Sequence, residues 1–162
     1  MTWQIPALDL KSSPVSCDLE IIGVFRDAGK KLSVSKGPYG SVLERLRTSG
    51  VFSAAVGSSE FIRFGGKNGA ESVLFVGLGN PADLTEEKAR CAGAVAWSKI
   101  LAEKPNKAVV SAACFQGVKG LNETISGPNW ALAMLEGMFL WAYQYGRHKS
   151  ADPHPFPDRV TL

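Results

Sequence analysis

Three apolar segments of the chain predict strands of a β-sheet. Residues 19–25 and 72–76 are short runs dominated by Leu, Ile, Val and Phe, and residues 108–115 form a third apolar run. The continuous run at 72–76 is typical of a strand that is buried on both faces, and we expect it at the centre of the sheet. Residues 60–64 alternate like a strand, and the glycine-rich residues 65–69 predict a turn that pairs them with the run at 72–76.

Three further segments have the spacing of helices and alternate with the strands. Residues 41–48 carry apolar side chains on one side and stop before a glycine. Residues 85–103 follow a capping residue, either Asp83 or Thr85, and have two glutamates in the first turn. Residues 130–145 form the last segment. This alternation predicts an α/β fold, with helices on both faces of a mixed or mostly parallel sheet.

The last predicted helix has almost no charge. Between residues 130 and 143 its only charged side chain is Glu136, so it lacks an ordinary solvent face. The stretch is shorter than the roughly 20 residues that cross a bilayer, and we expect no membrane span. We expect this helix to pack between its own sheet and a further partner, either a second domain or another subunit. The lone carboxylate is expected to pair with an arginine or to cap a backbone group.

Composition and charge argue against several classes of protein. The 162 residues have a net charge of +3 with scattered Lys and Arg, so no basic stripe favours nucleic acid as a partner. Cys17, Cys91 and Cys114 are far apart and lie among apolar residues, which predicts buried, reduced thiols. The N-terminus lacks the pattern of a secretory signal. We therefore expect a cytoplasmic protein.

No set of side chains in the sequence predicts a catalytic or metal site. Both kinds of site usually need a histidine close to carboxylates or thiols. The histidines, His148 and His154, lie near the C-terminal end beside a proline-rich stretch. His148 follows the last predicted helix, where a cation complements the helix dipole. We assign no catalytic, cofactor-binding or metal-binding residue.

Residues 77–82, Gly-Leu-Gly-Asn-Pro-Ala, are the one local motif with a chemical interpretation. A glycine turn between a strand and a helix can present backbone N–H groups to a phosphate. A dinucleotide site would also need an acidic residue at the end of the next strand, where the sequence has Gln116. In addition, Pro81 lacks an N–H donor. We therefore favour a tight turn that needs glycine flexibility over a phosphate site.

Three features of residues 72–150 occur together in one order. A buried strand runs into Gly-Leu-Gly and a helix that begins Leu-Thr-Glu-Glu-Lys-Ala-Arg, a strand follows at 108–115, and the closing helix carries Glu136-Gly137, Leu140, Tyr143 and Lys149-Ser150. This closing helix is similar to a family ending, Glu-Gly-x-x-Leu-x-x-Tyr-x-Phe-Asp-x-Tyr-Lys, although Tyr145-Gly146 replaces Phe-Asp. The combination resembles the N-terminal domain of the leucyl aminopeptidase (cytosol aminopeptidase) family.

The resemblance implies a fold related to macro domains and a place in a larger enzyme. In the family, a larger C-terminal domain binds two divalent metal ions, Zn or Mn, and removes N-terminal residues from peptides. Its signature, Asn-Thr-Asp-Ala-Glu-Gly-Arg, is absent from this sequence. The resemblance thus implies that residues 1–150 are a non-catalytic domain that supports a hexamer and shapes access to the active sites. Residues 151–162 are expected to be a proline-rich linker and the start of the catalytic domain.

Two alternative functions stay open at this point. One is a stand-alone macro-like module that binds a nucleotide or ADP-ribose near residues 77–82. The other is contact with DNA, which the resemblance implies because some bacterial leucyl aminopeptidases bind DNA through this region.

Overall fold

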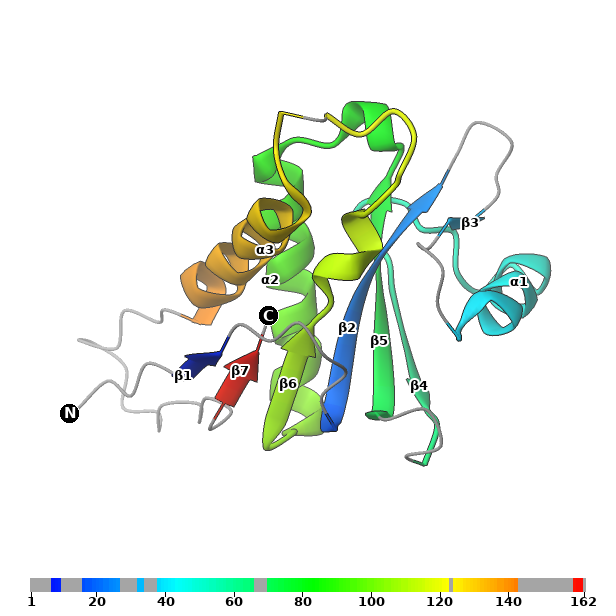
Figure 1. Cartoon of the computed structure of the whole chain (residues 1–162). Helices are drawn as coiled ribbons and strands as arrows, with labels where there is room; N and C mark the ends of the chain where they lie inside the picture. The colour runs from blue at the N-terminus through cyan, green and yellow to red at the C-terminus, as the bar shows by residue number, and fades with distance from the viewer. Residues whose placement is uncertain are drawn as a thin grey trace.

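The strands of the chain form one mixed sheet (Figure 1). The computed structural model describes residues 7–9, 16–26, 32–33, 38–65, 70–122, 124–142 and 159–161. Within these residues the strand order is β1-β7-β6-β2-β5-β4, and β3 pairs with β2 outside this path. The strands are β1 Ala7–Asp9, β2 Cys17–Arg26, β3 Leu32–Ser33, β4 Ser59–Arg63, β5 Ala70–Gly79, β6 Lys107–Val110 and β7 Arg159–Thr161.

The centre of the sheet is the parallel pair β2 and β5, and β5 contains the run at 72–76 that is predicted to be central. In register, Ile21 lies opposite Leu74 and Ile22 opposite Phe75, and all four side chains are buried. β6 extends the sheet in parallel beside β2, while β4 pairs antiparallel with β5. The continuous apolar runs are explained by this placement, because a central strand has both of its faces covered.

The helices cover both faces of this centre. Side chains alternate along a strand, so Phe75 and Val76 point to opposite faces of β5. The ring of Tyr39, just before α1 (Gly40–Thr48), lies 5.9 Å from that of Phe75. On the other face, a Cβ at Gly23, which is paired with Val76, would lie 3.2 Å from Cys114 of the 3-10 helix η2 (Ala112–Phe115). The α/β fold with helices on both faces is therefore confirmed.

The two long helices lie together on the η2 side (Figure 1). α2 (Glu86–Glu103) packs on β5, and α3 (Gly127–Ala142) packs along α2 and against η2. Thr85 caps α2, because its hydroxyl accepts a hydrogen bond from the N–H of Lys88. Of the two capping residues that the sequence offered, the structure uses this one. Among the described helices, none is both long and apolar enough to cross a membrane.

The strand predicted from the third apolar run is a strand only in its first part. The sequence predicts a strand over residues 108–115, but β6 ends at Val110 and the chain turns into η2. The N–H of Ser111 still donates to Ile21, and the Cys114 thiol then donates back to the carbonyl of Ser111. The turn places Phe115 against Phe25, with ring centroids 6.0 Å apart. An apolar run is buried in either conformation, so its hydrophobicity could not locate the break.

The last three described residues, 159–161, belong to the stretch 151–162, which the sequence predicts to be a linker and the start of a following domain. They do form a strand, β7, but it pairs in parallel with β6 and β1 of this same sheet. The boundary between residues 1–150 and 151–162 stays a prediction, because residues 143–158 lie outside the described part of the chain.

Candidate functional site

The glycine turn after β5 is packed against another segment of the backbone. The N–H of Gly77 donates to the carbonyl of Ser58, and the N–H of Gly79 donates to that of Ala54, at 2.8 and 2.9 Å. A Cβ on Gly77 would lie 2.7 Å from the carbonyl carbon of Ala54, and one on Gly79 would lie 2.9 Å from Val56. Gly79 also has a φ of +74°, which favours glycine. The two glycines therefore allow residues 54–58 to lie directly on the turn.

The rest of the turn also uses its donors internally. Asn80 accepts the N–H of Ala82 on its side-chain oxygen at 3.2 Å and the N–H of Asp83 on its carbonyl at 3.1 Å. Leu84 donates its N–H to the carbonyl of Pro81, which has no N–H of its own. A phosphate site at a helix N-terminus depends on N–H groups that point outward without a partner. The geometry therefore supports the tight turn and leaves the phosphate interpretation without these donors.

α2 and α3 approach one another unusually closely at two glycines. A Cβ on Gly93 of α2 would lie 2.7 Å from the carbonyl carbon of Met134, and one on Gly137 of α3 would lie 2.6 Å from Cα of Arg90. Both neighbours are main-chain atoms, which cannot rotate away as a side chain can. Each helix thus contributes one glycine that receives the backbone of the other. The two contacts lie within one turn of each helix and mark the point where α2 and α3 cross (Figure 1).

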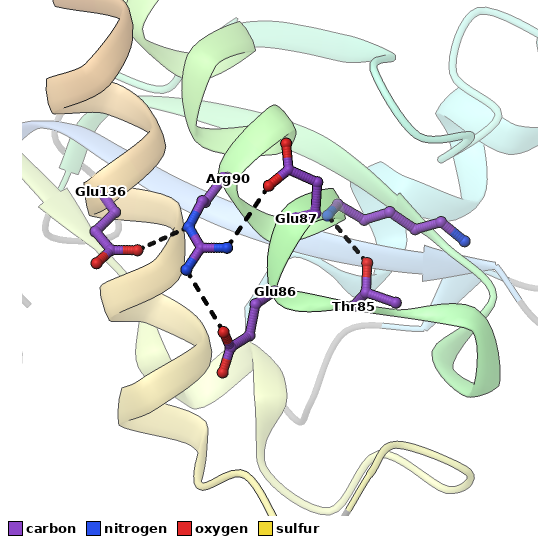
Figure 2. A network of polar contacts seen from close by, with 6 residues as sticks. Thr85, Glu86, Glu87, Arg90 and Glu136 are labelled. Carbon is purple, nitrogen blue, oxygen red and sulfur yellow. Dashed lines mark hydrogen bonds and ion pairs between the residues drawn. The ribbon is translucent and has the colours of Figure 1, made fainter.

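A network of charged side chains joins α2 and α3 along one side of this helix pair (Figure 2). Arg90 donates to the carboxylate of Glu136 across the two helices at 2.8 Å, and it also reaches Glu86 and Glu87 of its own helix at 3.5 and 3.6 Å. The hydrogen bond with Glu136 raises the pKa of Arg90. The pairing of the lone carboxylate of α3 with an arginine is thereby confirmed. Because the side chain of Glu136 is 60% exposed, the pair orients the helices more than it stabilises them.

The C-terminal end of α3 exposes large apolar side chains. Leu140 is 68% exposed and Trp141 is 60% exposed, and Leu132 two turns earlier is 43% exposed. Trp141 lies one turn after Gly137, on the side of α3 that faces α2. α3 ends at Ala142, directly after the exposed side chains of Leu140 and Trp141, and Leu132 lies on the opposite side of the helix from Trp141. We call Leu140 and Trp141 the α3 patch.

Two of the three cysteines are buried, as expected, and one is not. Burial raises the pKa of the Cys17 thiol to about 11 and that of Cys114 to about 12. Cys91, however, is exposed, which corrects the expectation for all three. It lies on α2 outside the buried stripe that contains Ala89 and Gly93. The apolar neighbours of Cys91 in the sequence do not show this, because position on the helix decides burial.

The described residues contain no group of three or more His, Cys, Asp and Glu side chains that could hold a metal ion. His148 and His154 lie outside the described residues. One hydrogen bond was not expected from the sequence: the hydroxyl of Tyr39, the residue before α1, donates to the carboxylate of Glu20 in β2 at 2.7 Å. The glycines inside α2 and α3 were the available sequence signal for the close helix pair, since glycine weakens a helix interior unless packing requires it.

Comparison with known proteins places the chain in a family. Residues 21–152 match the family described as the cytosol aminopeptidase family, N-terminal domain. The chain is 28% identical over 133 residues to a probable cytosol aminopeptidase of Geobacter sp. (strain M21). This match covers 82% of the chain but 25% of the relative, so the chain spans about a quarter of that protein's length.

Solved structures with the same fold include two enzymes and a macrodomain. A mutant of tomato leucine aminopeptidase matches 99% of the chain with 33% of its own length, at a TM-score of 0.67 and 22% identity. The bottromycin maturation enzyme BotP matches 90% of the chain with 27% of its own length, at a TM-score of 0.59 and 22% sequence identity. The macrodomain of Mycobacterium tuberculosis DarG matches 97% of the chain with 96% of its own length, at a TM-score of 0.62 and 10% sequence identity.

At these identities the structural likeness shows the fold, and it confirms the macro-domain-like sheet. The family match carries more, because it covers most of the sequence from the first central strand to beyond α3. This chain belongs to the cytosol aminopeptidase family, as its N-terminal domain.

Proposed function

We propose that the chain is the non-catalytic N-terminal domain of a cytoplasmic, two-metal leucyl aminopeptidase, an enzyme that removes N-terminal residues from peptides. One observation carries this proposal. The family match runs through residues 21–152, while the chain spans only about a quarter of the Geobacter relative. The larger part of such an enzyme would supply the chemistry.

The proposed division of labour agrees with the side chains of the domain. Two-metal hydrolysis needs clustered carboxylates that hold the ions and orient a water. The described residues have no such cluster, and the carboxylates of Glu86, Glu87 and Glu136 are engaged with Arg90. The residues present therefore do not fit a site for Zn or Mn. The two ions would be held by the larger domain.

We further propose that the domain supports assembly of the enzyme, a hexamer in this family, and shapes access to its active sites. The α3 patch supports this proposal, because Leu140 and Trp141 are neighbouring large apolar side chains that are both exposed, as is common on a contact surface. In isolation the patch would cause weak self-association at high concentration. Sedimentation velocity over a hundredfold range of concentration would measure this, and strictly monomeric behaviour would count against the role.

A hydrolysis assay tests the catalytic part of the proposal. The purified 162-residue chain, supplied with Mn²⁺ or Zn²⁺, should release no p-nitroaniline from leucine p-nitroanilide. The polypeptide that the source gene encodes beyond Leu162 should release it, and the gene should encode the signature Asn-Thr-Asp-Ala-Glu-Gly-Arg in frame. Turnover by the chain alone, after removal of contaminating peptidase, would refute the assignment of a non-catalytic role.

One structural likeness favours a second candidate, a stand-alone module that binds a nucleotide or ADP-ribose. The DarG macrodomain matches nearly the whole chain with nearly all of its own length. The N–H groups of the glycine turn argue against it, since they are used within the fold. Calorimetry with ADP-ribose distinguishes the two, because heat that saturates would support the module. Contact with DNA would be recognised by a gel shift that weakens with salt.

A further inference from the structure

We propose that the outer edge of β4 is a binding site for an extended peptide segment of another protein, which adds to the sheet as one further strand. The preferred segment carries an apolar side chain and a carboxylate on one face and polar side chains on the other. This binding goes beyond the proposed function and does not rest on it, because every residue that carries it lies in the described part of this chain.

The outer backbone groups of β4 are free to pair. Within the described part of the chain, β4 is the last strand of the sheet and no strand lies beyond it. The N–H of Phe64 donates to the carbonyl of Glu71 across the two strands, so the even-numbered residues of β4 bond with β5. Such bonds alternate along an antiparallel ladder, and the N–H and C=O groups of Ser59, Phe61 and Arg63 therefore face outward. These groups offer a row of donors and acceptors to another strand.

The sequence of β4 carries little protection against such pairing. Edge strands are commonly blocked by proline, by lysine or by a β-bulge. β4 reads Ser-Glu-Phe-Ile-Arg, and its register with β5 runs through all five residues without a shift. Its one cation, Arg63, is paired with Glu103 of α2 at 2.6 Å. The edge is thus regular and can accept a strand.

An apolar groove follows this edge on the α1 face of the sheet. Its lining residues come from one side of α1, at helical spacing, and from β4 and the residue after it: Val42, Arg45, Leu46, Ser49, Ile62 and Phe64. The four apolar side chains among them are only partly buried, so an apolar side chain of the added strand would cover them.

One charge at this groove is uncompensated. Arg47 of α1 is paired with Glu44, whereas Arg45 is exposed and has no ion pair among the described residues. No acidic side chain lines the groove. A carboxylate on the peptide face that enters the groove would complement Arg45.

A polar pocket borders the same edge on the opposite face. Phe61 and Arg63 of β4 line it together with Glu103 and Lys104 at the C-terminal end of α2. Side chains alternate along a strand, so Phe61 and Arg63 point away from the groove that Ile62 lines. Successive side chains of an added strand would therefore enter the apolar groove and the polar pocket in turn. In strand addition the main-chain bonds supply affinity, and pockets for alternate side chains supply specificity.

The arrangement of α1 and β4 favours a single strand over a second copy of the domain. Figure 1 shows α1 to the side of the sheet, beyond β4. A whole second sheet that paired with β4 would meet α1, whereas one extended segment has only its own side chains to place. Two folded molecules also need to bury about 800 Å² each, and an edge of five residues offers little of this area.

Fluorescence anisotropy with the 162-residue chain tests the hydrogen bonds to the edge. The probe is a fluorescein-labelled peptide with blocked ends, Thr-Leu-Thr-Glu-Thr-Leu-Thr, whose Leu and Glu side chains share one face of a strand. Two further versions are N-methylated at alternate residues, one at Leu and Glu and the other at Thr. One version should bind about tenfold or more weakly, because its methyl groups replace the N–H groups that face β4, and the other should bind within about twofold of the probe.

A charge exchange tests the groove. Arg45→Glu should weaken binding of the probe about fivefold and strengthen binding of a probe with Lys in place of Glu by about as much. Arg47→Glu is the matched control, because Arg47 lies on the same helix but lines neither pocket. It should change either affinity by less than about twofold.

Three results would overturn the proposal. The first is the absence of saturable binding, and the second is an equal effect of the two N-methylated versions. The third is self-association of the chain that the probe abolishes, which would assign the edge to a second copy. None of these results bears on peptide hydrolysis by a longer protein, so the aminopeptidase proposal stands or fails separately.

Discussion

The closest backbone approach in the domain should be the least tolerant of one added methyl group. Replacing Gly93 with Ala puts a Cβ 2.7 Å from the carbonyl carbon of Met134, whereas ordinary contact begins at 3.4 Å. The carbonyl oxygen of Met134 is nearer still, so α2 and α3 would have to separate by more than about 0.7 Å, and a gap of roughly 0.5–1 Å already removes a quarter to a half of the dispersion energy between facing atoms. Gly137→Ala meets the same obstacle at Arg90.

The expected cost follows from known overpacking. Inserting a methyl group into a packed interface costs about 1–3 kcal/mol, and the main-chain obstacle places Gly93→Ala at the upper end. The higher helix propensity of alanine offsets about 1 kcal/mol of this cost. We expect a net loss of about 2 kcal/mol in the free energy of unfolding. For a chain of this size that corresponds to a melting temperature lower by roughly 4–8 °C.

Urea unfolding followed by circular dichroism would measure this loss. Gly40→Ala is the control, because it also adds a methyl group to a helix but a Cβ there meets nothing within 4 Å. That variant should be neutral or slightly more stable. If Gly93→Ala unfolds within about 0.5 kcal/mol of Gly40→Ala at an unchanged m-value, the close helix approach does not constrain the fold.

Three further results are expected. A thiol reagent should modify Cys91 quickly in the native chain, and should modify Cys17 and Cys114 only after unfolding. More than one rapidly modified thiol per native chain would contradict this. The free energy of unfolding should fall as the pH rises above about 9 and on toward 11. In the unfolded chain the thiols ionise in this range, whereas burial keeps Cys17 and Cys114 neutral in the folded chain with raised pKa values of about 11 and 12, and the raised pKa of Tyr39 acts in the same direction. A urea midpoint that stays constant from pH 8 to 10.5 would refute this. Glu136→Gln should lower the melting temperature less than Gly93→Ala does, and the difference from the native chain should vanish in 1 M salt; a loss that persists in salt would mean that the pair contributes more than an exposed charge interaction.

The pattern of apolar residues was sufficient for the architecture. A continuous apolar run such as residues 72–76 is covered on both faces in the centre of a sheet, so this run predicted the central strand β5. The limits of α1 and α2 followed from local signals, such as the capping hydroxyl of Thr85, that depend on a few neighbouring residues. The family resemblance rested on the order of these same elements, and the family match confirmed it.

The break after β6 and the exposure of Cys91 were not predictable in this way. An apolar run is satisfied by burial in a strand or in a 3-10 turn, and only the packing of Phe115 against Phe25 selects the turn. Likewise, residues near Cys91 are apolar in sequence, but the angular position on α2 leaves the thiol outside.

By itself, then, the sequence determined the α/β class, the strand at the sheet centre, the start of α2 and the family, because each depends on periodicity or on residues close together in the chain; it did not determine the start of α3, which is Gly127 and not Trp130. The tertiary structure decided which donors of the glycine turn are used, which glycines bring α2 and α3 together, and where α3 stays uncovered. Those features depend on contacts between segments far apart in the chain, such as Gly77 with Ser58 and Arg90 with Glu136. No local pattern records a distance between two helices.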